Sequence, residues 1–177
     1  GEYLLNFRRQ VQLIFQDPYA SLNPLKNIME TIAEPIKYHR LIDDKNKIID
    51  KVTELLNDVG LDESFLPRYP HELSGGQRQR ICIARAICLN PKVIICDECV
   101  SALDVSVQAT ILNLLNSLKK KYDFTYIFIS HDLSVVKYMS DRIVVLFNGK
   151  VVEYEEADKM FLNPKSNYTK KLIKASI

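Results

Sequence analysis

Apolar residues recur along the chain with two different periods, which predict a mostly helical first half and an α/β second half. One apolar face repeats at i, i+4, i+7 and i+11 and consists of Ile48, Val52, Leu55 and Val59. This is the period of an amphipathic helix. It predicts a helix over 43–59, with Asp43 or Asp44 as its cap and Gly60 as its left-handed stop.

The rest of the first half is punctuated by proline, asparagine and glycine, which favour loops. The predicted elements are a strand over 11–15, a loop over 16–24, a helix over 27–36 that is broken near Pro35, a loop over 66–73 and a helix from Gly76 or Gln77 to about Cys88.

The second half alternates apolar runs with helical periods. Three nearly continuous runs over 92–96, 125–129 and 143–147 are typical of strands buried on both faces of a parallel sheet. The predicted helices are 105–121, capped by Asp104 or Ser106, then 133–139, and a short amphipathic one over 155–162. Asn148-Gly149 indicates a hairpin turn to a strand over 150–154, and the remainder is a polar tail. The order strand–helix–strand–helix–strand predicts the α/β class.

Polar residues follow three of these strands. They are Gln16-Asp17, Asp97-Glu98 and Ser130-His131-Asp132. Ligands of open α/β sheets bind beyond the carboxyl ends of the strands, so three such groups together favour a site. The alternative is that acidic residues simply cap strands and helices.

The segment Leu73-Ser74-Gly75-Gly76-Gln77 precedes a predicted helix. Two glycines allow close approach of the backbone to an anion, and a helix N-terminus favours phosphate. The alternative is an ordinary serine cap followed by flexible glycines. Three arginines that follow, Arg78, Arg80 and Arg85, fit a solvated basic face.

The composition is that of an ordinary globular protein, with 47% apolar and 26% charged residues among 177. Lys plus Arg is 24 and Asp plus Glu is 22, so the net charge of +2 gives no electrostatic case for nucleic acid or an anionic membrane. No apolar run approaches the ~18 residues that span a bilayer, and no secretory leader opens the sequence. Cys96 and Cys99 form a C-x-x-C pair, for which buried thiols are favoured over a zinc or redox site.

Taken together, these residues resemble the ATP-binding subunits of ABC transporters. The segment 73–77 is identical to the signature motif of that family, and 93–98 looks like its Walker B strand with the catalytic glutamate. Residues 101–104 resemble its D-loop, His131 its switch histidine and Gln16 its Q-loop glutamine. The five motifs stand in the family's order, and the resemblance extends over nearly all of the chain.

A narrower resemblance points to importers of oligopeptides and dipeptides. The loop 15–24 and the tail 163–172 are similar to motifs of that subgroup, which nickel and some glutathione importers share. Where the family often has Pro-Thr, this chain has Cys99-Val100, a change that we do not expect to abolish activity.

The resemblance implies the following roles at an ATP and Mg²⁺ site. Asp97, with Gln16, would hold Mg²⁺, Glu98 would orient and deprotonate the attacking water, and Gln16 would also reach that water. His131 would contact the γ-phosphate. Ser74, Gly75, Gly76 and Gln77 would bind the ATP held by the opposite subunit, and Asp104 would couple the two sites.

The implied partners are a second nucleotide-binding subunit, identical or related, and transmembrane permease subunits, with an extracytoplasmic solute-binding protein acting indirectly. No nucleic acid is implied, and the location is peripheral, on the cytoplasmic face of the cell membrane. One alternative is a non-catalytic docking module for a permease. Another is a soluble ABC ATPase of DNA repair or translation, against which the importer-like tail argues.

The phosphate-binding P-loop, G-x-x-x-x-G-K-[ST], does not occur, and there is no glycine between Glu2 and Val59. The resemblance places that loop upstream of Gln16, so we expect an incomplete nucleotide-binding domain that is inactive alone or folds with another copy. The expected parts are a core remnant over 1–16, a helical subdomain over 17–90, a RecA-like core over 91–154 and an importer-type extension over 155–177. Tyr3 is either an adenine stacker or an ordinary surface residue.

Overall fold

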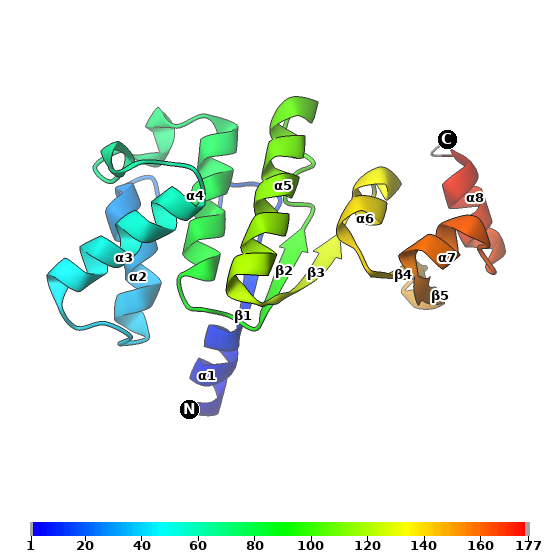
Figure 1. Ribbon diagram of the computed structural model, residues 1–177, viewed down its shortest axis with the longest axis horizontal. Helices are drawn as coiled ribbons and strands as arrows, with labels where there is room; N and C mark the ends of the chain where they lie inside the picture. Colours follow the sequence, from blue (N-terminus) through cyan, green and yellow to red (C-terminus); the bar gives the residue numbers. More distant parts are fainter. Residues whose placement is uncertain (1, 176–177) are drawn as a thin grey trace. The chain divides into compact units, whose positions relative to one another are not determined.

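The computed structural model describes residues 2–175, which form two compact units divided between Ile127 and Phe128. The first unit holds α1 (Glu2–Gln10), β1 (Val11–Ile14), α2 (Ile28–Tyr38), α3 (Lys45–Asp58), the single turns η1 (Glu63–Phe65) and η2 (Pro70–Glu72), α4 (Gly75–Ile87), β2 (Val93–Asp97), α5 (Val105–Tyr122) and the start of β3 (Thr125–Ile129) (Figure 1). The second unit holds the end of β3, α6 (Leu133–Met139), β4 (Arg142–Phe147), β5 (Lys150–Glu156), α7 (Ala157–Leu162) and α8 (Asn167–Ala175). The pattern of apolar residues predicted neither α1 nor α8.

A three-stranded sheet in the order β1-β2-β3 confirms the predicted α/β class. β1 and β2 pair in parallel, with Ile14 opposite Cys96. Both of these side chains are buried, as is typical of parallel strands whose faces are covered by helices. The prediction that β3 is buried on both faces is wrong, because Ile127 and Ile129 remain 51% and 47% exposed.

The third apolar run does not join this sheet. β4 pairs with β5 in antiparallel fashion, as a separate two-stranded sheet. Asn148 and Gly149 both have positive φ, 48° and 73°, the conformation of the tight hairpin turn that the dipeptide predicted. The turn places β5 directly beside β4, so antiparallel pairing within the hairpin replaces the parallel pairing predicted for this run.

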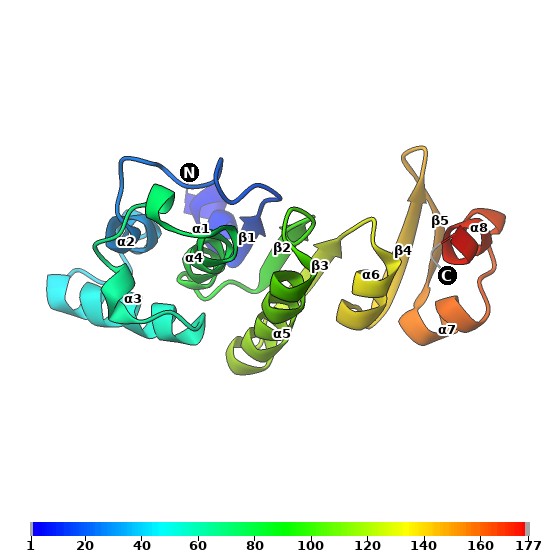
Figure 2. The same cartoon turned by 90° about the horizontal axis from the view of Figure 1, so that it is seen from above.

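Helix α4 lies between the α2–α3 pair and α5 in both views of the molecule (Figures 1 and 2). The core of the first unit consists of fully buried residues from these helices and the sheet, among them Ile32, Ile36, Leu55, Leu56, Ile81, Ile83, Ile87, Ile94 and Ile111. The predicted amphipathic helix is α3. Its cap is Asp44, which accepts a hydrogen bond from Lys47 N at 3.0 Å, and Gly60 follows its end with φ of +71°.

The predicted break near Pro35 is wrong, because α2 continues through this proline to Tyr38. A proline inside a helix removes one backbone hydrogen bond. Ile32, Ala33 and Ile36 on either side of it are buried, so packing against the neighbouring helices holds the last turn in place.

The second unit has its own small core of Val136, Ile143, Val145, Ala157 and Met160. The segment expected to be a polar tail is instead the helix α8, which Glu153 of β5 anchors. The carboxylate of Glu153 accepts hydrogen bonds from the backbone nitrogens of Lys165 at 2.8 Å and Ser166 at 2.9 Å. The rings of Phe147 and Tyr168, 4.2 Å apart, add an apolar contact.

This anchor predicts a pH-dependent contribution to stability. Burial by itself raises the pKa of the Glu153 carboxyl, but the hydrogen bonds from the backbone nitrogens of Lys165 and Ser166 offset this and leave the pKa below its usual value. Because the folded pKa is lowered, the stabilisation is present at neutral pH and is lost as the pH falls through the folded pKa.

We therefore expect Glu153→Gln to lower the free energy of unfolding by about 1–3 kcal/mol at pH 7. The glutamine NH₂ group cannot accept a hydrogen bond, so one of the two backbone N–H groups, that of Lys165 or of Ser166, loses its acceptor. The difference from the wild-type chain should shrink as the pH falls below about 4. Urea unfolding of both chains at pH 7 and pH 3 measures it. A difference that does not change with pH would contradict the assignment of this stabilisation to an ionised Glu153.

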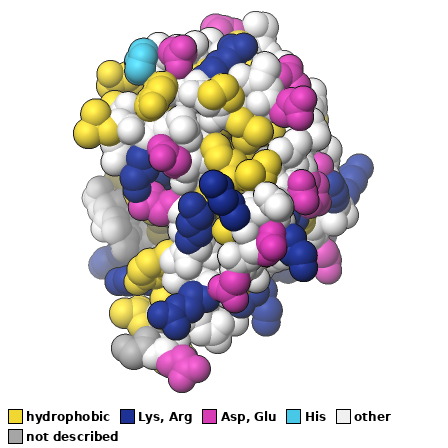
Figure 3. All heavy atoms as spheres, turned by 90° about the vertical axis from the view of Figure 1, so that its left-hand side faces the viewer, with side chains coloured by type: hydrophobic (Ala, Val, Ile, Leu, Met, Phe, Trp, Pro, Cys, Tyr) yellow, Lys and Arg dark blue, Asp and Glu magenta, His cyan; other side chains and the backbone are white. Residues whose placement is uncertain are grey.

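Within residues 2–175, none of the helices combines the length and the apolar composition needed to cross a membrane. On the face shown in Figure 3, positively and negatively charged side chains are interspersed with apolar ones. This face therefore lacks the uniformly basic surface with which proteins bind nucleic-acid phosphates.

Candidate functional site

The segments that follow β1 and β2 are joined by a chain of hydrogen bonds. Gln16 Nε2 donates to Ser101 Oγ at 3.2 Å, and Ser101 Oγ donates to the carbonyl oxygen of Glu98 at 2.9 Å. The backbone turns sharply here, since Glu98 has φ of 47° and Ser101 N also donates to its carbonyl oxygen at 3.0 Å. The structure thus brings Gln16 and the Asp97-Glu98 pair to one edge of the sheet.

The two carboxylates at this edge differ in exposure. Asp97 ends β2 and is exposed, whereas Glu98 is half-buried in the turn. Among the described residues, no group of three or more His, Cys, Asp or Glu side chains is arranged to hold a metal ion. A single exposed carboxylate at this edge suits Mg²⁺, which usually takes one or two carboxylates and completes its shell with water and substrate phosphates.

All four cysteines are free, buried thiols, as predicted for Cys96. Burial raises the pKa of Cys82 to about 11 and that of Cys88 to about 12. A hydrogen bond with the Cys99 side chain, together with burial, raises the pKa of Cys96 well above its usual value. The C-x-x-C pair therefore lies in the apolar interior, where free cysteines pack as small hydrophobic residues.

The serine–glycine segment begins α4 with a complete capping box. Ser74 Oγ accepts a hydrogen bond from Gln77 N at 3.2 Å, and Gln77 Oε1 accepts one from Ser74 N at 2.9 Å. The serine cap is therefore present, but the glycines are not merely flexible. A Cβ atom on Gly76 would lie 2.6 Å from Val107 Cγ1, whereas one on Gly75 would lie at an ordinary 3.7 Å from Leu103 Cδ2. Gly76 is required because α4 crosses α5 at this point.

Asp104 begins α5 beside that crossing. Its Oδ1 accepts hydrogen bonds from Val107 N at 2.9 Å and Ser106 Oγ at 2.8 Å. These bonds, the one from Val107 N foremost, lower the pKa of the Asp104 carboxyl. The N-termini of α4 and α5 thus meet at Gly76 and Val107, which joins the serine–glycine segment to the turn that follows Glu98.

The three arginines of α4 do not form a solvated basic face. Each guanidinium donates to backbone carbonyl oxygens of a neighbouring loop. Arg78 Nη1 binds Leu73 O at 2.7 Å and Pro70 O at 3.1 Å, Arg80 Nη1 binds Val59 O at 2.6 Å, and Arg85 Nη1 binds Ser21 O at 2.7 Å. Through these hydrogen bonds α4 fixes the end of α3, the loop that precedes α4 and the loop that follows β1.

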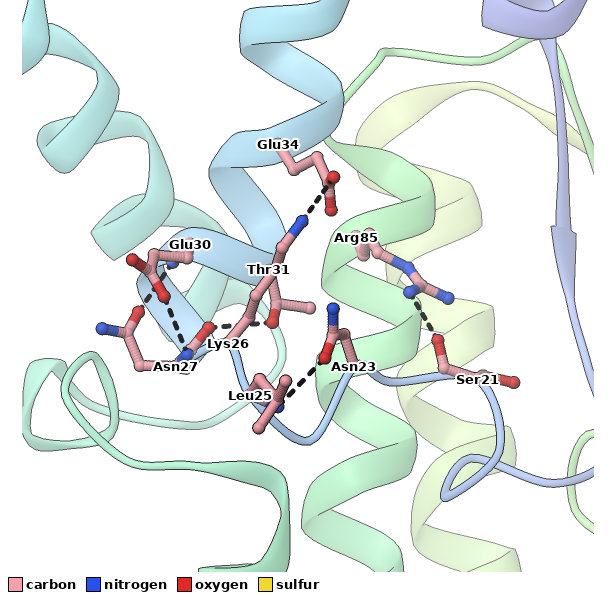
Figure 4. Close-up of polar contacts among 9 residues, drawn as sticks. All are labelled: Ser21, Asn23, Leu25, Lys26, Asn27, Glu30, Thr31, Glu34 and Arg85. Atoms are coloured by element: carbon pink, nitrogen blue, oxygen red, sulfur yellow. Dashed lines mark hydrogen bonds and ion pairs between the residues drawn. The ribbon is translucent and has the colours of Figure 1, made fainter.

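Figure 4 shows how Arg85 reaches the loop after β1. The same view shows the capping box of α2, in which Asn27 Oδ1 accepts from Glu30 N at 2.8 Å and Glu30 accepts from Asn27 N at 3.1 Å. The loop is thus fixed at Ser21 and again at its exit into α2.

We expect Arg85→Met to release this loop, because Ser21 O loses a charge-assisted hydrogen bond. The free energy of unfolding should fall by about 1.5–3 kcal/mol. Amide exchange of residues 19–22 should accelerate, as measured by hydrogen–deuterium exchange. Lys47→Met, at an exposed position of α3, is the control and should change neither quantity. Unchanged exchange in Arg85→Met would show that the bond does not hold the loop.

His131 belongs to the second unit and is not among the residues that these contacts join. It is exposed and precedes Asp132, whose Oδ1 caps α6 by accepting from Ser134 N at 2.8 Å. The sequence analysis included Ser101 in the D-loop-like segment 101–104 but did not predict its link to Gln16. The position of Ser101, three residues after Glu98, was a signal for its side chain-to-backbone turn. The close approach of Val107 to Gly76 carried no local signal, because it depends on how α4 and α5 cross.

Comparison with known proteins places these motifs in a family. A family model described as ABC transporter matches residues 3–101, which is more than half of the chain. The chain belongs to the ABC transporter family. Its resemblance to ABC transporter ATP-binding subunits is thereby confirmed.

Relatives within the ABC transporter family are oligopeptide and glutathione transport proteins. The chain is 54% identical over 172 residues to the oligopeptide transport ATP-binding protein OppF of Bacillus subtilis (strain 168), covering 97% of this chain and 56% of that protein. It is 51% identical to OppF of Streptococcus mutans, covering 99% and 57%. It is 52% identical to the glutathione import ATP-binding protein GsiA of Escherichia coli (strain K12), covering 95% and 27%. The chain spans about half the length of the oligopeptide relatives.

A solved ABC structure shares the fold. It is a dimeric, post-hydrolysis state of the ATP-binding cassette MJ0796 bound to ADP and Pi, 31% identical, with a TM-score of 0.75 over 89% of this chain and 67% of that one. This similarity confirms the predicted fold class as that of an ABC ATPase.

Proposed function

We propose that the whole protein is the nucleotide-binding subunit of an ABC importer that couples ATP hydrolysis to the uptake of oligopeptides or dipeptides. The observation that carries the proposal is the hydrogen-bonded chain Gln16–Ser101–Glu98 at the sheet edge, adjacent to the crossing of α4 and α5. It is supported by the oligopeptide transport relatives at about 50% identity.

The residues proposed for the site have complementary chemistry for phosphoryl transfer to water. Asp97 and the amide oxygen of Gln16 would hold Mg²⁺, which supplies neutralisation of phosphate charge when bound. Glu98 would orient the attacking water and accept its proton. His131 would donate a hydrogen bond to the γ-phosphate, where negative charge develops.

The N-terminus of α4 suits the nucleotide of a second subunit. The first-turn N–H groups of a helix have no acceptor within the helix, and its dipole favours anions. Ser74, Gly75, Gly76 and Gln77 would therefore bind a γ-phosphate presented from outside this chain. Asp104, beside the crossing with α5, would couple the two sites.

The proposed assembly follows from these roles. Two nucleotide-binding subunits, identical or related, would enclose ATP and dock on transmembrane permease subunits at the cytoplasmic face of the membrane. A solute-binding protein would deliver the peptide to the permease from outside. We retain 17–90 as the helical subdomain, 1–16 and 91–154 as parts of the catalytic core and 155–177 as the importer-type extension.

The test is transport by vesicles that contain the full-length protein and its permease. We expect ATP inside the vesicles to drive accumulation of labelled trialanine supplied with the solute-binding protein, and omission of ATP to abolish it. Parallel assays with glutathione and with Ni²⁺ distinguish the alternatives, since glutathione importers are also relatives. ATP-driven uptake of glutathione or Ni²⁺ without peptide uptake would reject the peptide assignment. Permease binding without ATP hydrolysis would favour a docking module.

A further inference from the structure

The side chain of Gln79 in α4 is fully buried, and neither its amide oxygen nor its amide nitrogen has a hydrogen-bond partner. Burying an amide in this way costs free energy, because it loses hydrogen bonds to water and gains none. Folded proteins retain few such groups, and each one requires an explanation.

Packing alone does not explain this amide. The other buried residues of α4 are all apolar, namely Ile81, Cys82, Ile83, Ala84, Ala86 and Ile87. Methionine or leucine at position 79 would fill a similar volume without an unpaired polar group. The unpaired amide of Gln79 therefore destabilises the conformation that the structure describes.

The position of Gln79 indicates where a partner lies. Gln79 follows Gly75 by four residues and Gly76 by three, so all three share one face of α4. That face meets Leu103 and Val107, as the close approaches at the two glycines show. Helical side chains lean toward the N-terminus of their helix, so Gln79 leans toward the glycine turn, where Gly75 contacts Leu103 of the segment 101–104.

This segment is already linked to the candidate site. The Ser101 hydroxyl accepts a hydrogen bond from Gln16 Nε2 and donates one to the carbonyl oxygen of Glu98. Asp104 at the other end of the segment caps α5. A hydrogen bond from the Gln79 amide to the backbone of 101–104 would therefore connect α4 to the residues proposed to bind Mg²⁺ and water.

We propose that Gln79 is a positioning residue whose amide forms hydrogen bonds to the backbone of Ser101–Asp104 when nucleotide closes the site. The inference rests on the proposed function, since it requires ATP to bind there. The unpaired amide raises the free energy of the resting state, and its pairing favours the closed state. The side chain thus shifts the balance between the two states toward closure.

The test uses the full-length protein and the variant Gln79→Met, which keeps the length of the side chain and removes its hydrogen-bonding atoms. Without nucleotide, the variant should unfold at a temperature about 2–4 °C higher than the wild type, because the unpaired amide is gone. Saturating ATP should slow amide exchange of residues 101–104 in the wild type and leave it unchanged in the variant. Gln79→Leu repeats both measurements should the methionine variant fail to fold.

Thr31→Val is the matched control. Thr31 is also buried, but its Oγ1 already donates to Asn27 O at 2.8 Å, so this variant should unfold at a lower temperature and keep the ATP effect. A lower unfolding temperature of Gln79→Met would show that the amide is paired in the resting state and would overturn the inference. ATP protection of 101–104 equal to that of the wild type would overturn it as well. A wild-type protein that shows no ATP effect would instead refute the proposed function, and the coupling role with it.

Discussion

Replacement of Glu98 by glutamine in the full-length protein is expected to lower the rate of ATP hydrolysis by about 10²–10⁴-fold, the usual contribution of a positioned general base. Glutamine preserves the size of the side chain and the left-handed turn at this residue, so ATP binding should persist. Steady-state phosphate release measures the loss, and a calorimetric titration with ATP measures binding. The combination separates a defect in chemistry from a defect in folding.

Glu34→Gln is the matched control for this substitution. Glu34 is exposed and pairs with Lys26 at 2.5 Å, an exposed ion pair of the kind that contributes little to stability. Its hydrolysis rate should equal that of the wild type. A Glu98→Gln protein that hydrolyses ATP at more than about a tenth of the wild-type rate would assign the general base to another residue.

Replacement of Gly76 by alanine should destabilise the fold by about 1–3 kcal/mol, the typical cost of overpacking. The new methyl group would lie 2.6 Å from Val107 Cγ1, so α4 and α5 would have to separate. Trimming the opposing side chain with Val107→Ala in the same chain should recover most of the loss. Urea unfolding of the two single variants and the double variant gives the coupling energy directly.

Gly75→Ala supplies the control from the same helical turn. Its Cβ would meet Leu103 Cδ2 at 3.7 Å, an ordinary contact, and alanine is favoured over glycine in helices by up to about 1 kcal/mol. This variant should be as stable as the wild type or more so. Equal destabilisation at both positions, or no recovery with Val107→Ala, would show that the helix crossing does not require Gly76.

Helices with clear periods and explicit caps were predictable from the sequence. Asp44, Ser74 and Asp104 each cap the helix that follows, and Gly60 ends α3 in the left-handed conformation. These features are local, since each depends on residues within about four positions along the chain. The hairpin at Asn148-Gly149 was predictable for the same reason.

Features that depend on distant partners were not predictable. α2 continues through Pro35 because of tertiary packing, and β4 pairs with β5 rather than with the parallel sheet. The arginines of α4 bind loop carbonyls up to 64 residues away, which no pattern of charge along the chain reveals. The α8 segment depends on residues earlier in the chain, namely the anchor at Glu153 and the contact of Tyr168 with Phe147.

For the site, the motifs predicted which residues matter, whereas the structure supplied the links between some of them. Gln16 and Glu98 were named from the sequence, but Ser101 as the residue between them was not. The contact of Gly76 with Val107 likewise depends on how two helices cross. The roles assigned to these residues in nucleotide chemistry remain proposals that the variants above address.

The most direct test of the central claim is a calorimetric titration of the full-length protein with ATP, performed with Mg²⁺ and again with EDTA, in the wild type and in Asp97→Asn. The account predicts that wild-type protein binds ATP more tightly with Mg²⁺ and that Asp97→Asn loses this difference while still binding ATP. The 177-residue chain, titrated in parallel, should bind weakly or not at all, because it contains no P-loop sequence. Absence of ATP binding by the full-length protein, or an undiminished Mg²⁺ effect in Asp97→Asn, would contradict the account.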